Sequence, residues 1–350
     1  MFQKPPQNHI LNVGQTLQMN RLYNLLSFPR IFLYTVNALR TQRIFIKNNL
    51  EPLIKEFQKD QNSELTNSDV KKIRRYYGYA VPAILGEGFC ILRSETLTQN
   101  ERIALTYLGA LTGLYDDFFD KLDTSDSHIL ELTTNPDEKI TRNIHEFLFV
   151  KFYLIALNHC PSPNLLKQRF LGVYEAQLLS KRQKDSKLST EEISSITLLK
   201  GGVSLLFYRS ALVGQPNKNE ESLLYKLGGL MQLENDIFDI HKDYQDNIST
   251  LVTTVRKISE LRITYTRLHE ETMILLSLTH FAKNNKLFFM RFINLIIYRG
   301  SVCLDCLERN ETLTNGFFSI KDYERKYLIC DMGKFKNIIK VFQYFANSKV

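Results

Sequence analysis

Residues 114–120 of this chain read LYDDFFD, and they close an apolar stretch that begins near residue 103. The apolar residues recur at helical spacing, so residues 103–119 predict a buried amphipathic helix. Asp116 and Asp120 are four residues apart and share one face of that helix, with Asp117 beside them. Three neighbouring carboxylates repel one another and need a counter-charge. Hard oxygen ligands suit Mg²⁺, so the stretch predicts a metal site, with a solvated helix end as the structural alternative.

A second acidic stretch lies at residues 232–243, which read QLENDIFDIHKD. Asn235, Asp239 and Asp243 are spaced i, i+4 and i+8, so they form a row along one helix face. The apolar residues between them are suited to hold such a helix in a bundle. Two oxygen-rich rows on separate helices suggest a cavity in which both rows share a polyanion with several metal ions.

The pattern Asp-Asp-x-x-Asp followed by Gln-x-x-Asn-Asp-x-x-Asp resembles the class I isoprenoid synthase superfamily, which comprises all-helical trans-prenyltransferases and terpene cyclases. The resemblance implies a single-domain all-α bundle with a central active-site cavity. It also implies three Mg²⁺ ions when diphosphate is bound, held by Asp116, Asp117, Asp120, Asn235, Asp239 and Asp243. The second motif is a hybrid. Asn235 is typical of cyclases, Gln232 and Asp239 are typical of prenyltransferases, and Asp243 stands where a cyclase has Glu.

Length and composition agree with a large helical domain. The chain has 350 residues, of which 44% are hydrophobic, with only 9 Pro and 15 Gly. We expect a polar lead-in at residues 1–26 and one helical domain at residues 27–350. After the first acidic stretch, helical patterns cover residues 137–159, 164–184, 190–213, 220–241, 251–283, 287–308 and 320–347.

The net charge of +8 could indicate nucleic acid or a membrane surface as a partner. The basic residues are dispersed, and no recognised nucleic-acid module is present, so an acidic diphosphate substrate explains part of the charge better. The apolar region 287–304 is interrupted by Arg291, Asn294 and Arg299, so it predicts a core helix without stable membrane insertion. No secretory signal is visible, and the five cysteines are interpreted as buried thiols in a reducing cytoplasm.

Proline and capping residues place the first helices. Pro29 predicts the start of an apolar helix that reaches about residue 57, with a break at Pro52. Asn67 or Ser68 is expected to cap the next helix. This helix carries Lys72 and Arg75.

Lys72 and Arg75 have the Lys-x-x-Arg spacing of the prenyltransferase segment that binds isopentenyl diphosphate. The paired glycines and the adjacent proline of that segment are missing, so a solvated basic face is the alternative. Prenyltransferases follow the first acidic motif with an Arg pair, whereas this chain continues with Lys121 and Leu122. Both departures favour a cyclase with one substrate.

The resemblance also assigns residues to the substrate. Gln177 and Gln232 would face it, and Lys200, Arg182, Arg325 and Tyr327 would donate to its diphosphate. Gly201 and Gly202 would allow close backbone approach, with tight helix packing as the alternative. Phe119 and Phe207 are candidates for the cavity lining.

The expected activity is that of a Mg²⁺-dependent class I terpene synthase, which ionises a linear prenyl diphosphate and converts the carbocation to a terpene hydrocarbon or alcohol. A prenyl diphosphate synthase or a head-to-head condensing prenyltransferase of the same fold is the alternative. A non-catalytic subunit and a helical nucleic-acid-binding protein are remote alternatives, and a homodimer is possible.

Overall fold

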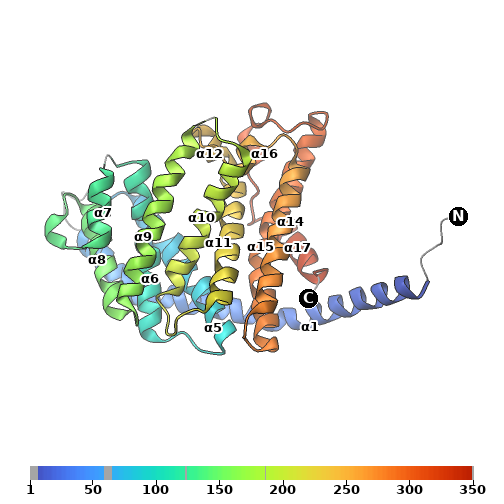
Figure 1. Cartoon of the computed structure of the whole chain (residues 1–350), viewed down its shortest axis with the longest axis horizontal. Coiled ribbons are helices and arrows are strands. Elements are labelled where there is room, and N and C mark those ends of the chain that lie inside the picture. Colours follow the sequence, from blue (N-terminus) through green and yellow to red (C-terminus); the bar gives the residue numbers. More distant parts are fainter. Residues whose placement is uncertain (1–6, 59–64, 123, 186, 349–350) are drawn as a thin grey trace.

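Helices make up the regular structure of this computed structural model, which describes residues 7–58, 65–122, 124–185 and 187–348. No strand forms in these four ranges, so the all-α prediction is confirmed. Most helices stand side by side in a bundle. The first helix runs along one edge of the bundle and projects beyond it (Figure 1).

The elements follow one another with short connections. In chain order they are α1 (Gln7–Phe45), η1 (Ile46–Leu50), α2 (Glu51–Gln58), α3 (Asn67–Lys71), η2 (Lys72–Tyr77), α4 (Gly78–Ala80), η3 (Val81–Gly86), α5 (Glu87–Arg93), α6 (Gln99–Asp120), α7 (Asp126–Thr134), η4 (Glu138–Ile140), α8 (Ile144–His159), α9 (Pro163–Ser180), η5 (Lys181–Lys184), α10 (Thr190–Arg209), α11 (Lys218–Phe238), α12 (Ile240–Gln245), α13 (Leu251–Thr254), α14 (Ile258–Leu278), α15 (Lys283–Leu313), η6 (Ile320–Asp322), α16 (Arg325–Leu328) and α17 (Phe335–Ala346).

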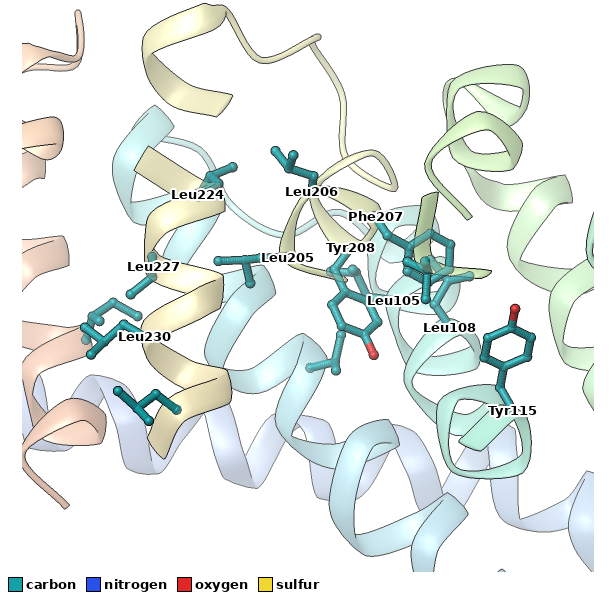
Figure 2. Close-up of a cluster of buried hydrophobic side chains, with 14 of the residues drawn as sticks. Leu105, Leu108, Tyr115, Leu205, Leu206, Phe207, Tyr208, Leu224, Leu227 and Leu230 are labelled. Atoms are coloured by element: carbon teal, nitrogen blue, oxygen red, sulfur yellow. The ribbon is translucent and has the colours of Figure 1, made fainter. Parts of the chain in front are cut away.

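The helix α6 carries the first acidic motif and lies in the core. Its start is fixed by Thr98, whose hydroxyl accepts from the backbone N–H of Glu101 while the Glu101 carboxylate accepts from the backbone of Thr98. Leu105 and Leu108 on the same helix are fully buried. Figure 2 shows them in one apolar cluster with side chains of α10 and α11, so burial of this face orients the acidic end of α6.

The prediction that Pro29 begins a helix is wrong, because α1 starts at Gln7 and passes through Pro29. It therefore also crosses the boundary expected at residue 27. Pro29 is exposed on α1. The residue before it, Phe28, packs edge-on against Phe342 and Phe345 of α17, with 4.7 and 5.6 Å between ring centroids. These contacts with α17 hold both halves of the helix despite the hydrogen bond that proline removes.

Two wide π-helical turns, η2 and η3, interrupt the helical run from α3 to α5. The N-cap of this helical run is Thr66, which exchanges hydrogen bonds with Asp69. The cap predicted from the sequence, Asn67 or Ser68, lies one or two residues further along the chain. Pro82 lies in η3. The break predicted at Pro52 corresponds to the π-helical turn η1, which ends two residues before this proline. Such turns redirect side chains within a helix and are frequent at functional sites.

The helices α10 and α11 approach so closely that their backbones touch. A Cβ atom on Gly201 would lie 2.1 Å from the carbonyl oxygen of Gly228, and one on Gly228 would lie 2.2 Å from that of Gly201. Gly202 packs against the ring of Tyr225 in the same interface. The structure therefore supports the helix-packing interpretation of the paired glycines.

The apolar helix α15 is long and apolar enough to cross a membrane by length and composition, and 56% of its most apolar window is buried inside the fold. It packs against α5, α11, α14 and α17. Its buried polar residue Asn294 accepts a hydrogen bond from His269 at 2.8 Å, for the tautomer protonated at Nε2. These contacts agree with the prediction of a core helix.

All five cysteines are free thiols. Cys306 of α15 lies 3.6 Å, sulfur to sulfur, from Cys330, which follows α16. The hydrogen bond with Cys330 and burial raise the pKa of the Cys306 thiol, and the hydrogen bond with Cys303 and burial raise the pKa of the Cys330 thiol, so neither is an activated thiolate.

Replacing Gly228 by Ala should destabilise the protein by about 2 kcal/mol or more, because its new methyl group would overlap the Gly201 carbonyl and force α10 and α11 apart. Urea unfolding followed by circular dichroism measures this loss. The matched control is Gly172→Ala in α9, where no heavy atom lies within 4 Å of the new Cβ. This control should be neutral or slightly stabilising. Equal stability of the two variants would contradict the contact.

Candidate functional site

A cavity of about 360 Å³ lies between the π-helical turns and helices α6, α9, α10, α11 and α15. Most of its wall is apolar, and Figure 2 shows three of the lining side chains, Leu205, Phe207 and Tyr208, projecting from α10. Its polar lining residues are Tyr77, Thr112, Tyr115, Asp116, Gln177, Lys200, Ser204, Tyr208, Gln232, Glu234, Asn235 and Arg299. A largely apolar pocket with a few polar groups is the usual form of a small-molecule site.

Asp116 brings the first acidic motif into this cavity. Its carboxylate accepts a hydrogen bond of 2.6 Å from the side-chain amide of Gln177 on α9. Burial raises the pKa of Asp116, and the charges of Asp120 and Asp117 act in the same direction, whereas Lys200 opposes the shift. Gln177 therefore fixes the orientation of a carboxylate whose negative charge is only partly compensated.

Asp117 faces a different neighbour. It is buried, and its carboxylate forms ion pairs with Lys72 at 2.7 Å and Lys121 at 3.1 Å. Lys72 is therefore committed to the first acidic motif rather than to a solvated surface. The side chain of Arg75, its predicted partner, lies outside the described part of the structure. Asp117 is not among the residues that line the cavity, and its predicted role as a metal ligand stays a prediction.

The second acidic row crosses a break in the helix. α11 ends at Phe238 and α12 begins at Ile240, with Asp239 at the junction. The backbone bonds from Asp239 to Asn235 and from Asp243 to Asp239, both 2.9 Å, preserve the i, i+4 spacing across the break. The Asn235 amide also donates to the Asp239 carboxylate at 3.4 Å. The three residues thus keep the row that the sequence predicts.

Asp236, directly after Asn235 in the chain, is a buried acid that the sequence analysis did not assign. It accepts hydrogen bonds from Gln232 at 2.8 Å and Thr197 at 3.2 Å. Burial raises the pKa of Asp236 to about 6. Gln232, assigned to the substrate by the resemblance, lines the cavity and positions this acid. The sequence signal for Asp236 was its position directly after Asn235. The i, i+4 and i+8 spacing pointed to Asn235 and passed over Asp236.

Two side chains link the acidic groups across the cavity. The charge of Lys200 opposes the rise in the pKa values of Asp116, Asp236 and Asp243, so this residue acts electrostatically on acids of both motifs. The hydroxyl of Tyr77 has a pKa raised well above its ordinary value by the charge of Asp116 and by burial, with a smaller contribution from Asp239. The tertiary structure therefore brings together acids that are more than a hundred residues apart in the chain.

The acidic groups fit a hard cation in chemistry but not as a preformed cage. No group of three Asp, Glu, His or Cys side chains within the described ranges is close enough to hold a metal ion. Burial raises the pKa of Asp243 to about 7, and the charges of Asp236 and Asp239 add to this shift. A divalent cation would relieve the repulsion, and its remaining ligands would come from water and substrate oxygens, as Mg²⁺ prefers.

The other predicted site residues divide between the cavity and the surface. Gly201 and Phe207 line the cavity, whereas Gly202 contacts Tyr225 behind it. Phe119 lies outside the lining, with its ring 5.3 Å from that of Tyr115 and below the ammonium group of Lys181. Its predicted role stays a prediction.

The predicted diphosphate donors Arg182, Arg325 and Tyr327 are exposed and do not line the cavity. Arg182 forms a surface ion pair with Glu192 at 2.7 Å. Arg325 and Tyr327 belong to α16, which packs against α12, and Tyr327 lines a separate pocket beside α15. Their predicted roles as diphosphate donors stay predictions.

An ion pair in the cavity wall was missed from the sequence. Glu234 of α11 is buried and accepts a hydrogen bond of 2.9 Å from Arg299 of α15. Burial raises the pKa of Glu234 to about 7 even though Arg299 opposes the shift. The sequence signal for this ion pair was Arg299, a cation within an apolar helix. The sequence analysis used this residue only as evidence against a membrane span.

A polar contact between α10 and α6 was also missed. The Tyr208 hydroxyl lies 2.7 Å from that of Thr112, which joins α10 to α6 on the cavity wall. The sequence spacing around Thr112 and Tyr208 does not indicate that these two residues are in contact.

No protein-family model, curated protein or solved structure matches this chain.

Replacing Asp243 by Asn should stabilise the metal-free protein by on the order of 2 kcal/mol above pH 8 and by little near pH 4. The folded-state pKa of Asp243 is raised from 3.8 to about 7, so the folded protein binds the proton more tightly and wild-type stability falls as pH rises through this range. Denaturant unfolding in EDTA at both pH values measures the difference. Added Mg²⁺ should stabilise the wild type more than the variant.

Asp246→Asn is the control, because this acid is exposed at the end of α12. If the unfolding free energy of both variants depended on pH in the same way, the buried charge of Asp243 would not destabilise the fold.

Proposed function

We propose that this chain is a Mg²⁺-dependent class I terpene synthase that acts on one linear prenyl diphosphate. The observation that carries the proposal is that Asp116 and Asn235, one from each acidic motif, line the same apolar cavity together with Lys200. The chemistry needs this combination, because a charged diphosphate and a hydrocarbon chain must be held in one site. The motifs and their order supply the resemblance, and the cavity supplies a place for the substrate.

The polar residues of the cavity lining suit the diphosphate. Mg²⁺ bound there would clamp the diphosphate oxygens and neutralise the charge that develops on them as the carbon–oxygen bond breaks. Lys200 would donate to the same oxygens from α10. Gln177 holds the Asp116 carboxylate in place through its 2.6 Å hydrogen bond, so this ligand needs no reorganisation during the reaction.

The apolar part of the lining suits the carbocation that remains. Breaking the bond leaves pyrophosphate and an allylic cation, which ends as a hydrocarbon by losing a proton or as an alcohol by capturing water. Phe170 and Phe207 present adjacent rings to the cavity, 4.7 Å apart between centroids, and aromatic faces stabilise cations. The apolar wall excludes bulk water until the cation is quenched.

The position of Lys72 favours the one-substrate reaction over chain elongation. A prenyltransferase needs a second cationic site for isopentenyl diphosphate, and Lys72 is one of its two predicted contributors, together with Arg75. Its ammonium group is instead paired with Asp117 at 2.7 Å. A prenyl diphosphate synthase or a condensing prenyltransferase of the same fold remains the second candidate. A non-catalytic subunit is less consistent with this site, because buried, mutually repelling acids serve no evident purpose without a ligand.

Asp116→Asn should lower turnover by about 10²-fold or more, because it removes a charge from the cation site while leaving an oxygen to accept from Gln177. Purified protein is incubated with C10, C15, C20 and C25 prenyl diphosphates, with and without Mg²⁺, and the organic products and pyrophosphate are measured. The control Asp126→Asn alters an exposed acid that pairs with Lys181 on the surface and should keep full activity. Normal activity of the Asp116→Asn variant would contradict the proposed function.

Adding isopentenyl diphosphate should leave the product unchanged, because Lys72 is engaged by Asp117. The same incubation is repeated with this second substrate, and the diphosphate fraction is examined for longer chains. Elongated diphosphates that appear only with isopentenyl diphosphate would identify the prenyltransferase branch instead.

A further inference from the structure

The outer face of α1 exposes a continuous apolar stripe. Leu22, Leu26, Leu33 and Val36 are spaced i, i+4, i+11 and i+14, so they lie along one side of the helix. The side chains of Leu26 and Leu33 are 69% and 66% exposed. Single exposed leucines are ordinary on protein surfaces, but a stripe that runs for four turns marks an interaction surface.

The opposite face of α1 is fixed to the fold, so the helix cannot turn its stripe inward. Asn24 is buried and donates to the carbonyl oxygens of Phe345 and Ser348 at 3.2 and 3.0 Å. Gln42, about five turns further along the helix, is also buried and donates to the carbonyl oxygen of Gly78 at 3.0 Å. Rotation of α1 about its axis would break these bonds and leave buried polar groups without partners.

The charge around the stripe has one sign. Residues 1–50 contain no Asp or Glu, and their basic residues are Lys4, Arg21, Arg30, Arg40, Arg43 and Lys47. Arg40, Arg43 and Lys47 are exposed and continue the outer face beyond Val36. The far end of α1 projects clear of the other helices (Figure 1), so an extended surface can reach it.

We propose that the outer face of α1 binds an anionic lipid surface, with the helix lying in the plane of the interface. Exposed leucines would enter the boundary between head groups and acyl chains, and the arginines and lysine would contact the negatively charged head groups. The opposite, buried face keeps the bundle attached to the helix. This inference does not depend on the terpene synthase activity.

The charge pattern argues against a second copy of the chain as the occupant. Two α1 helices packed along their stripes would place several like charges near one another, and no acid in residues 1–50 could pair with them. An anionic membrane offers both the apolar phase and the opposite charge.

The chain contains no tryptophan, so Leu33→Trp places a single fluorophore on the stripe. With vesicles of phosphatidylcholine and phosphatidylglycerol, the emission of this full-length variant should shift to the blue and be quenched by brominated lipid. Both effects should weaken with pure phosphatidylcholine and at high salt. The control Ile263→Trp, at a position 67% exposed on α14, should change little. An unchanged Leu33→Trp spectrum would overturn the proposal.

Vesicle co-sedimentation of the tryptophan-free chain gives a second measurement. The triple variant Leu22→Ser, Leu26→Ser and Leu33→Ser should bind these vesicles at least about tenfold more weakly than the wild type. The control triple Ile263→Ser, Ile274→Ser and Leu313→Ser changes exposed residues of other helices and should bind normally. Circular dichroism checks that both variants fold. Unchanged vesicle binding by the first triple variant, or a wild-type dimer in sedimentation that this variant abolishes, would contradict the lipid surface as the occupant.

Discussion

The contact between α10 and α11 at Gly201 and Gly228 is the constraint on which the candidate site depends. With no side chain at either position, the two backbones touch, and Asn235 of the second row lines the same cavity as Lys200. A larger residue at either glycine would separate the helices, because the blocking atoms are main-chain carbonyls that cannot rotate away. The same contact places Gly201, Gly228 and Asn235 in one cavity wall. The cost of two glycines in helices is therefore balanced by an arrangement that no other residue permits.

The acids of the two motifs differ in how their charges are compensated. Asp117 is neutralised within the fold by Lys72 and Lys121. Asp116, Asp236 and Asp243 share the influence of Lys200 instead, and burial raises the pKa values of all three. Buried charges without full compensation are expensive, and they are concentrated at binding sites for that reason. This imbalance supports the proposal that a cation and a polyanion enter the cavity together.

Irregular helix geometry shapes the opposite wall. The π-helical turns η2 and η3 contribute Tyr77, Val81 and Ile84 to the lining. The long helices α1 and α15 support the bundle in different ways. α15 is largely enclosed and contributes Arg299 to the cavity, whereas α1 attaches by one face and leaves the other open. The apolar surface of the chain is thus divided among a core, a cavity and an exposed helix face.

Hydrophobic periodicity determined the all-α fold and the shared faces of Asp116 with Asp120 and of Asn235 with Asp239, because these depend on the regular geometry of a helix. Local rules failed at Pro29, where packing of Phe28 against α17 outweighs the helix-breaking effect of proline. The pairs Lys72–Asp117 and Glu234–Arg299 join residues 45 and 65 positions apart, and no local pattern indicates them. The sequence could state two uses for the glycines of α10, and only the tertiary structure shows that both pack tightly against α11 while Gly201 also lines the cavity. The sequence by itself determined which residues share a helix face, since that follows from bonds four residues apart. Tertiary structure alone decided which faces meet and which charges remain uncompensated, because both depend on contacts between distant segments.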